Sequence, residues 1–232
     1  MRKVLPFIIV GAVGIATLTS ATLLYRAKRP PTLKLTADRP AGDKPGESVH
    51  IRGRVDAPVT LEEYGDFQCP PCGKLAGPIK DLEKDYGNSL RVIFHNFPLI
   101  THQHATKAAC AAEAAGLQGK FWEMHDAIYS EQERWSKAAD VQPLFNAYAG
   151  LIGLDVKRFQ EDVNSDKIKE RVSADQRHGS SLGIQTTPTI FLNNRAVDPA
   201  DLAPDRLRKL VDAAVKEAAL GKTSPVASPS SK

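Results

Sequence analysis

The chain has 232 residues, of which 42% are hydrophobic and 25% charged, and its formal net charge is +4. That length and hydrophobic content suffice for one good-sized core. Five of the 31 basic residues flank a single N-terminal apolar segment, and the remaining 26 balance 27 acidic residues, so nothing indicates a nucleic-acid-binding protein. Three cysteines are too few for a disulfide-stapled scaffold or for two zinc-type pairs.

The N-terminal segment is apolar over a length that suits a membrane. Residues 4–25 contain no charge, and they match the roughly 20 residues that span a bilayer. The apolar character continues past the small residues Ser20 and Ala21, which favours an uncleaved anchor over a secretory signal. We therefore predict a membrane anchor or signal segment at 1–27. Basic residues on both sides leave its orientation open.

Two further segments carry no sustained apolar period. Residues 28–50 are rich in proline, glycine and charge, which is typical of a linker, and a short edge strand is expected at its end around Ile51. Residues 222–232 are rich in serine and proline and are expected to be disordered. These boundaries leave residues 51–221 as the folded domain.

Within this domain, apolar periodicity predicts an α/β fold. Strands are expected at 59–64, 90–95 and 187–192, followed by a tight turn at Asn193-Asn194 and a short returning strand at 195–197. Helices are expected at 74–86, 105–117, 120–129, 141–152, 156–163 and 167–178, and after a cap at 198–205. The first strand–helix–strand unit has the spacing of a parallel pair. The helices between the second and third strands predict an inserted helical subdomain at about 101–182.

The central motif is the stretch 66–73, Asp-Phe-Gln-Cys-Pro-Pro-Cys-Gly, which joins the first strand to the first helix. If Cys69 lies where the helix begins, free backbone N–H groups and the helix dipole favour its thiolate and lower its pKa. Such a thiolate can attack a disulfide, and Cys72 can resolve the mixed disulfide. The motif therefore predicts dithiol–disulfide exchange. It holds no histidine between the cysteines, so we expect a milder oxidant than a histidine-containing motif.

Alternative interpretations exist for the chemistry-bearing residues. A Cys-x-x-Cys pair can be half of a metal site, but zinc needs two more ligands and no second pair exists. The alternative to redox chemistry is therefore a copper ion bound by Cys69 and Cys72. His102 and His104 resemble a metal pair, but they open a helix in a loop, and we do not expect them to be metal ligands. Other candidates are expected to be ordinary core residues: Cys110, His125, Trp122 and Trp135.

The sequence resembles the DsbA-like branch of the thioredoxin superfamily over about residues 50–220. Besides the dithiol motif, the resemblance rests on 65–68 (Gly-Asp-Phe-Gln), 97–99 (Phe-Pro-Leu), 119–122 (Gly-Lys-Phe-Trp) and 183–189 (Gly-Ile-Gln-Thr-Thr-Pro-Thr), in this order. It is closest to the membrane-anchored or exported single-domain members. The resemblance implies a thioredoxin fold with an inserted helical subdomain.

The resemblance also implies roles for individual residues. Cys69 would be the exposed nucleophile and Cys72 the more buried resolving thiol of a redox-active disulfide. Pro188 would be a cis-proline beside the dithiol, which turns the main chain of Thr187 towards an extended substrate. Glu63 matches the family's buried acidic position and could transfer the proton that resolution requires. If the strand register slips by one residue, Glu62 takes that place.

The function that the resemblance implies is a thiol–disulfide oxidoreductase without a cofactor or a metal. Its substrates would be reduced or misoxidised exported polypeptides, and a membrane quinone-linked thiol oxidase would reoxidise it. We expect a monomer, held at the membrane by the N-terminal anchor, with the catalytic domain outside the cytoplasm because a working oxidant needs an oxidising compartment. The alternatives are a disulfide reductase or isomerase, and a copper-handling dithiol module.

Overall fold

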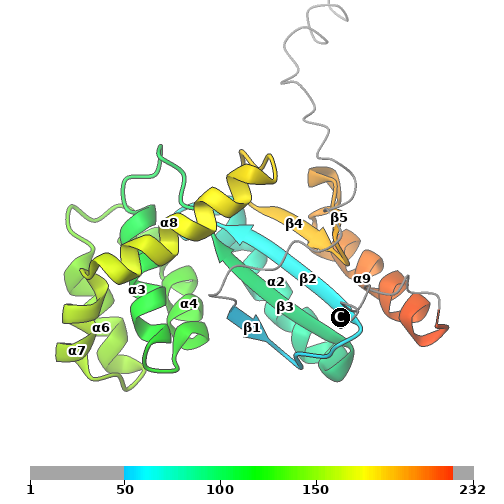
Figure 1. Ribbon diagram of the computed structural model, residues 1–232, viewed down its shortest axis with the longest axis horizontal. Helices are drawn as coiled ribbons and strands as arrows, with labels where there is room; N and C mark the ends of the chain where they lie inside the picture. The colour runs from blue at the N-terminus through cyan, green and yellow to red at the C-terminus, as the bar shows by residue number, and fades with distance from the viewer. Residues whose placement is uncertain (1–49, 222–232) are drawn as a thin grey trace, which may run out of the picture. The chain divides into compact units, whose positions relative to one another are not determined.

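In the computed structural model, the described residues are 50–221 (Figure 1). The predicted anchor at 1–27, the predicted tail at 222–232 and all but the last residue of the linker lie outside them. Within residues 50–221, no helix combines the length and the apolar character needed to cross a bilayer.

The described residues build one five-stranded mixed sheet. Its strands are β1 (His50–Arg52), β2 (Val59–Gly65), β3 (Leu90–Asn96), β4 (Thr189–Leu192) and β5 (Arg195–Ala196), arranged in the order β1-β3-β2-β4-β5. The central pair β2 and β3 is parallel, whereas β1, β4 and β5 pair antiparallel with their neighbours. The predicted edge strand, parallel pair and returning strand are thus confirmed. Nearly every residue of β2 and β3 is buried, because helices cover both faces of the central pair.

Helix α2 (Pro70–Tyr86) connects β2 to β3 and begins four residues before the predicted start at 74. The reason is local: Cys69 is the N-cap, and Pro70 and Pro71 occupy the first helical positions, where a missing N–H costs nothing and the fixed φ is already helical. The first turn of the helix therefore contains the dithiol motif itself. A short 3₁₀ turn, η1 (Gly87–Ser89), leads from α2 into β3.

Six helices lie between β3 and β4 and form the predicted insertion. They are α3 (Ala105–Gly116), α4 (Phe121–Ser130), α5 (Gln132–Trp135), α6 (Gln142–Leu151), α7 (Val156–Val163) and α8 (Asp166–Ser181). Helices α3, α4, α6 and α7 group together beside the sheet, and α8 runs back from them across it (Figure 1). The one-turn helix α5 was not predicted, because four residues carry no readable period.

The chain returns to the sheet through a cis peptide bond between Thr187 and Pro188. Strand β4 begins at Thr189, two residues later than predicted, since these two residues form the bend before it. Asn193 and Asn194 both adopt positive φ, 49° and 65°, as the predicted tight turn requires. After the 3₁₀ turn η2 (Pro199–Asp201), helix α9 (Pro204–Ala219) closes the fold.

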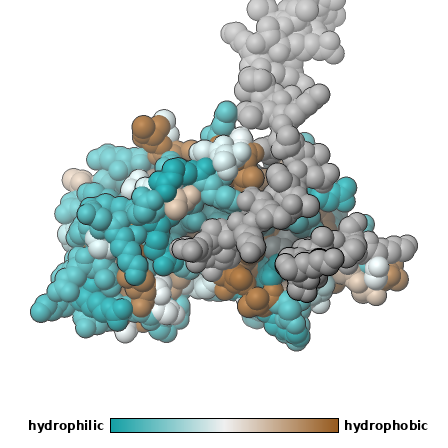
Figure 2. All heavy atoms as spheres, viewed as in Figure 1, coloured by the Kyte–Doolittle hydropathy of each residue, from teal (hydrophilic) through white to brown (hydrophobic). Residues whose placement is uncertain are grey.

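Two large clusters of buried side chains hold these layers together. One lies where α2 and α9 pack against the sheet, and it buries the predicted α9 face, including Leu207 and Val211. The other fills the helical subdomain around the alanine-rich α3 and extends to Cys69 and Cys72. The described surface on the face seen in Figure 2 is mainly hydrophilic, with scattered small apolar patches. The dithiol therefore lies where the helical subdomain meets the sheet.

Candidate active site

Cys69 is the N-cap of α2, with φ −73° and ψ 119°, and Cys72 lies in the first turn. Because Pro70 and Pro71 have no N–H, the first helical N–H after Cys69 belongs to Cys72. All three cysteines of the described chain are free thiols, so this is the reduced form of the site. The sequence expectation that Cys69 stands where a helix begins is confirmed.

The two thiols have opposite acid–base properties. The side chain of Cys72 hydrogen-bonds to the Cys69 sulfur and lowers the pKa of Cys69 to about 6, against the opposing effect of burial, and the backbone N–H of Cys72 adds to the lowering. Burial raises the pKa of Cys72 far above its ordinary value, and the neighbouring Cys69 and Glu63 raise it further. At neutral pH the pair therefore holds its negative charge on Cys69.

The nucleophile is less exposed than expected. The side chain of Cys69 is 4% exposed and that of Cys72 is 0% exposed. The bend before β4 accounts for part of this cover, because the Cys69 sulfur lies 3.3 Å from the carbonyl oxygen of Thr187, to which it donates a hydrogen bond when it is protonated. The order of exposure agrees with the expectation, but the description of Cys69 as an exposed group is wrong for this reduced form.

The cis bond at Pro188 places Thr187 beside the dithiol, as the resemblance implied. The carbonyl of Thr187 faces the Cys69 sulfur, and the Thr187 hydroxyl is buried without a partner among the described residues. The predicted pairing of this segment with an extended substrate stays a prediction.

Glu63 and Glu62 lie on opposite faces of β2. Glu63 is 3% exposed and faces the dithiol side of the sheet; burial, together with the charge on Cys69, raises its pKa to about 8. Glu62 points to the other face, where its Oε1 lies 2.7 Å from Nε2 of His95. The register thus places Glu63, and not Glu62, near Cys72. Its predicted role in proton transfer stays a prediction.

The hydrogen bonds of one carboxylate, that of Asp66, hold the loop before Cys69 in place. Oδ1 of Asp66 accepts the backbone N–H of Gln68 at 2.7 Å, and its Oδ2 accepts the backbone N–H of Leu99 at 2.8 Å. The same Oδ2 lies 2.7 Å from Nδ1 of His102, whereas Nε2 of His104 lies 2.9 Å from the carbonyl oxygen of Ala138. The two histidines are thus engaged separately by the protein, and the suggested metal pair is not formed.

Gln132 of α5 is a site residue that the sequence did not indicate. Its Nε2 donates hydrogen bonds to the carbonyl oxygens of Phe67 at 2.7 Å and of Cys69 at 2.9 Å. A Cβ at Gly73 would stand 2.5 Å from its Oε1, so Gly73 leaves the space that this side chain needs. Gln132 lies 60 or more residues from both partners along the chain, and no local pattern could have revealed the contact.

Of the residues expected to be ordinary core groups, Cys110, His125 and Trp135 are buried, and Trp122 is half-buried against the core. Burial lowers the pKa of His125, whose Nδ1 lies 2.9 Å from Oδ1 of Asp126. Burial raises the pKa of Cys110 to about 11, which makes its thiol unreactive at neutral pH. The indole of Trp135 is fully buried, and that of Trp122 donates to the Ile51 carbonyl oxygen at 3.0 Å.

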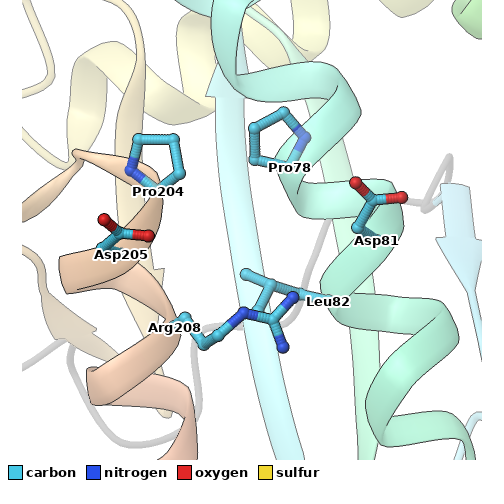
Figure 3. Close-up of a pocket in the computed structure, with 6 residues that line it drawn as sticks. All are labelled: Pro78, Asp81, Leu82, Pro204, Asp205 and Arg208. Carbon is cyan, nitrogen blue, oxygen red and sulfur yellow. The ribbon is translucent and has the colours of Figure 1, made fainter.

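Away from the dithiol, the described residues form a shallow groove and no metal-binding cluster. Among residues 50–221, no group of three or more His, Cys, Asp or Glu side chains is arranged to hold a metal ion. A shallow groove runs between α2 and α9 (Figure 3) and is lined by Pro78, Asp81, Leu82, Pro204, Asp205 and Arg208. No residue of the dithiol motif or of the Thr187–Pro188 bend lines this groove.

Solved structures share this architecture. The chain superimposes on α-DsbA1 from Wolbachia pipientis with a TM-score of 0.64 and 20% sequence identity, covering 76% of this chain and 96% of that one. It superimposes on MdbA from Actinomyces oris, a thiol–disulfide oxidoreductase, with a TM-score of 0.59 and 19% identity, covering 71% of this chain and 87% of that one. The fold is a thioredoxin fold of the DsbA type, with its helical insertion.

The family follows from the sequence comparison. The thioredoxin family model matches residues 46–213, and the chain belongs to that family as a DsbA-like member. Its sequence is also 40% identical over 154 residues to the Na(+)/H(+) antiporter NhaA 1 from Mycolicibacterium gilvum. That match covers 64% of this chain but 24% of the antiporter, so the chain spans about a quarter of the length of this curated relative.

Proposed function

We propose that this protein is a thiol–disulfide oxidoreductase that transfers a disulfide to reduced or misoxidised exported polypeptides. The observation that carries the proposal is the asymmetry of the dithiol: the Cys69 pKa is lowered to about 6, while the Cys72 pKa is raised. A stabilised thiolate at Cys69 makes this sulfur both a good nucleophile and a good leaving group. The class of the similar solved structures supports the same chemistry.

The reaction starts from the oxidised form, in which Cys69 and Cys72 share a disulfide. A substrate thiolate attacks the Cys69 sulfur; a bond between the substrate and Cys69 forms, and the bond to Cys72 breaks. Cys72 leaves with the electron pair and takes a proton from Glu63, which holds one at neutral pH because its pKa is about 8. A second substrate thiolate then attacks the substrate sulfur of the mixed disulfide. The substrate disulfide forms, and Cys69 leaves as its stabilised thiolate.

We place this reaction at the membrane, outside the cytoplasm. The apolar segment at 1–27 supports an anchor, and an oxidising compartment is what a disulfide donor requires. The likeness of this chain to part of a Na(+)/H(+) antiporter supports the membrane part of this placement. Reoxidation needs an acceptor for two electrons, for which a membrane quinone-linked thiol oxidase is the proposed partner.

The test is an equilibrium with glutathione. The purified protein is mixed with reduced and oxidised glutathione at several ratios, with and without a chelator, and the oxidised fraction is read by thiol trapping. We expect a reversible two-electron equilibrium that Cys69→Ser abolishes and that the chelator leaves unchanged. Exchange that disappears with the chelator would favour the copper-handling alternative. A potential as reducing as that of a dedicated reductase would reverse the direction of electron flow, in favour of the reductase alternative.

A further inference from the structure

Two buried polar atoms on the dithiol side of the sheet lack a partner among the described residues. They are Oε1 of Glu63, on β2, and the hydroxyl oxygen of Tyr129, on α4. Tyr129 is 6% exposed, and its ring packs on that of Phe67 with a centroid separation of 4.8 Å. Buried polar groups are nearly always hydrogen-bonded, so two such atoms in one region require an explanation.

Both groups interact electrostatically with the same thiol. Cys72 is the ionisable group that interacts most strongly with the Tyr129 hydroxyl, and Glu63 is the next. The charge of Glu63 in turn raises the pKa of Cys72. The other ionisable groups that face Tyr129 are Asp66 in the loop and Cys69 at the start of α2. Cys69, Cys72, Glu63 and Tyr129 therefore form one buried cluster around the dithiol.

This cluster must accommodate a charge when the disulfide opens. Once Glu63 has protonated the departing Cys72 sulfur, a carboxylate remains in a buried place that disfavours it. Asp66, the other charged group near this step, is acidic and makes the carboxylate less favourable still, whereas Cys69 is neutral at this point because it is bonded to the substrate sulfur. A hydroxyl donor is the group in this cluster that can stabilise it.

We propose that Tyr129 is a positioning residue for Glu63: its hydroxyl hydrogen-bonds to the Glu63 carboxyl group through one water molecule and stabilises the carboxylate left after proton transfer to Cys72. The inference rests on the proposed exchange reaction and extends it with a residue of the helical insertion. Tyr129 exchanges no proton itself; the proton moves from Glu63 to the Cys72 sulfur, and the electron pair of the broken disulfide bond stays on that sulfur.

The test compares Tyr129→Phe with Tyr148→Phe. Tyr148, on α6, also has a hydroxyl without solvent contact or a partner among the described residues, but it lies in a less deeply buried place and its ionisable neighbours are Glu131 and Arg134 instead of the dithiol. Each substitution removes one hydroxyl group and leaves the ring in place. The first measurement is the titration of Glu63 in the reduced protein, followed by carbon NMR of its carboxyl group. The second is the rate at which reduced glutathione opens the disulfide of the oxidised protein.

We expect Tyr129→Phe to raise the pKa of Glu63 by about one unit and to slow disulfide opening about tenfold, because one hydrogen bond to a charged group is lost. Tyr148→Phe should change neither quantity. In a Glu63→Gln background, Tyr129→Phe should cause no further slowing. Urea midpoints close to that of the parent protein would confirm that both variants fold.

Unchanged titration and rate in Tyr129→Phe would overturn the inference. The NMR titration needs no turnover, so the two proposals can fail separately. A shifted Glu63 pKa in a protein that exchanges no disulfides would contradict the proposed function and leave the hydrogen bond supported. Normal disulfide exchange with an unshifted Glu63 pKa would support the proposed function and contradict the hydrogen bond.

Discussion

At the scale of single residues, the chemistry follows from the interaction between the two thiols, each of which shifts the pKa of the other. Pro70 and Pro71 remove two N–H donors, so the Cys69 thiolate depends mainly on the side chain of Cys72, and less on Thr187 and on the backbone N–H of Cys72. The same proximity, together with burial, keeps Cys72 protonated. One charge is thus shared unequally between two identical groups.

This asymmetry predicts the pH dependence of alkylation. In the reduced protein, iodoacetamide should modify Cys69 with a half-maximal rate near pH 6, the pKa of its thiol. Cys72 and Cys110 should react far more slowly, because the pKa of each is raised. Mass spectrometry of the labelled peptides measures all three. A midpoint near 9 for Cys69 would contradict the assignment.

The same thiolate predicts the reduction potential. A pKa of about 6 stabilises the reduced form, so oxidising power should exceed that of thioredoxin, whose thiol has a pKa of about 7. It should fall short of DsbA, with a pKa of about 3.5. We expect a potential between about −270 and about −120 mV, measured against glutathione. A value at the DsbA end would show that the absent histidine is not needed for strong oxidation.

Glu63 predicts a stability that depends on pH. Its folded pKa of about 8 lies above its ordinary 4.5, so the folded state holds a proton that the unfolded state releases. The stability linked to this proton is fully present below about pH 4.5 and is lost as the pH rises through 8. At pH 8, the free energy of unfolding of Glu63→Gln should therefore be several kcal/mol higher than that of the parent protein, since each unit of pKa shift is worth about 1.4 kcal/mol.

Urea titrations of the oxidised protein measure this difference without interference from the thiols. Glu161→Gln, at an exposed position of α7, is the matched control and should leave the pH dependence unchanged. If Glu63→Gln follows the parent at every pH, the carboxyl group is not held protonated in the fold.

At the scale of elements, the helical insertion fixes the loop that carries the nucleophile. Gln132 of α5 binds two carbonyls on either side of Gln68, and the Gln68 amide oxygen accepts the backbone N–H of His104 at 2.6 Å. Asp66 ties the same loop to the segment after β3. Contacts from several parts of the insertion thus immobilise the few residues before α2.

Gln132→Ala tests this function of the insertion. The substitution leaves two partly buried carbonyls without their donor, so the free energy of unfolding should fall by about 1–3 kcal/mol. Gln118 is the control, because its amide also makes two hydrogen bonds to a backbone, that of Asp155, but in an exposed position. Gln118→Ala should cost less than about 0.5 kcal/mol. Equal effects in urea denaturation would show that the loop needs no support from α5.

At the scale of the whole molecule, a buried polar network joins the other face of the sheet to α3 and α8. His95 lies between Glu62, at 2.7 Å, and Asp175, at 3.7 Å. Asn96 links Asp175 to Glu113. The Glu113 carboxylate is in turn 2.7 Å from Nε2 of His50 and 2.9 Å from Nε of Arg171, its two basic partners. Charge pairing, as well as apolar packing, therefore connects the sheet to the helices of the insertion.

The network predicts a second pH effect. Burial opposes the charge on His95, but the nearby carboxylates of Asp175 and Glu62, the second of them hydrogen-bonded, outweigh it and raise its pKa above 6.5. The associated stability is fully present below 6.5 and is lost as the pH rises through the folded pKa. In the oxidised Glu63→Gln variant, the free energy of unfolding should still fall as the pH rises. Adding His95→Gln to this variant should remove that fall.

His125 provides a control of opposite sign. Burial lowers its pKa, so its contribution to stability is present above 6.5 and is lost as the pH falls. Denaturation curves between about pH 5 and pH 9 separate the two histidines. If His95→Gln and His125→Gln change the pH dependence in the same direction, the charge assigned to His95 is wrong.

The sequence by itself determined what depends on neighbours along the chain. The apolar periods of β2, β3 and most helices, the paired asparagines of the hairpin turn and the Cys-Pro-Pro-Cys motif at a helix start were all readable, because backbone preferences and side-chain periods act over a few residues. Only the tertiary structure decided which glutamate faces the dithiol, how far Thr187 covers Cys69, and that Gln132 and Tyr129 reach the site. These depend on strand register and on the packing of an insertion distant in sequence, which no local pattern encodes.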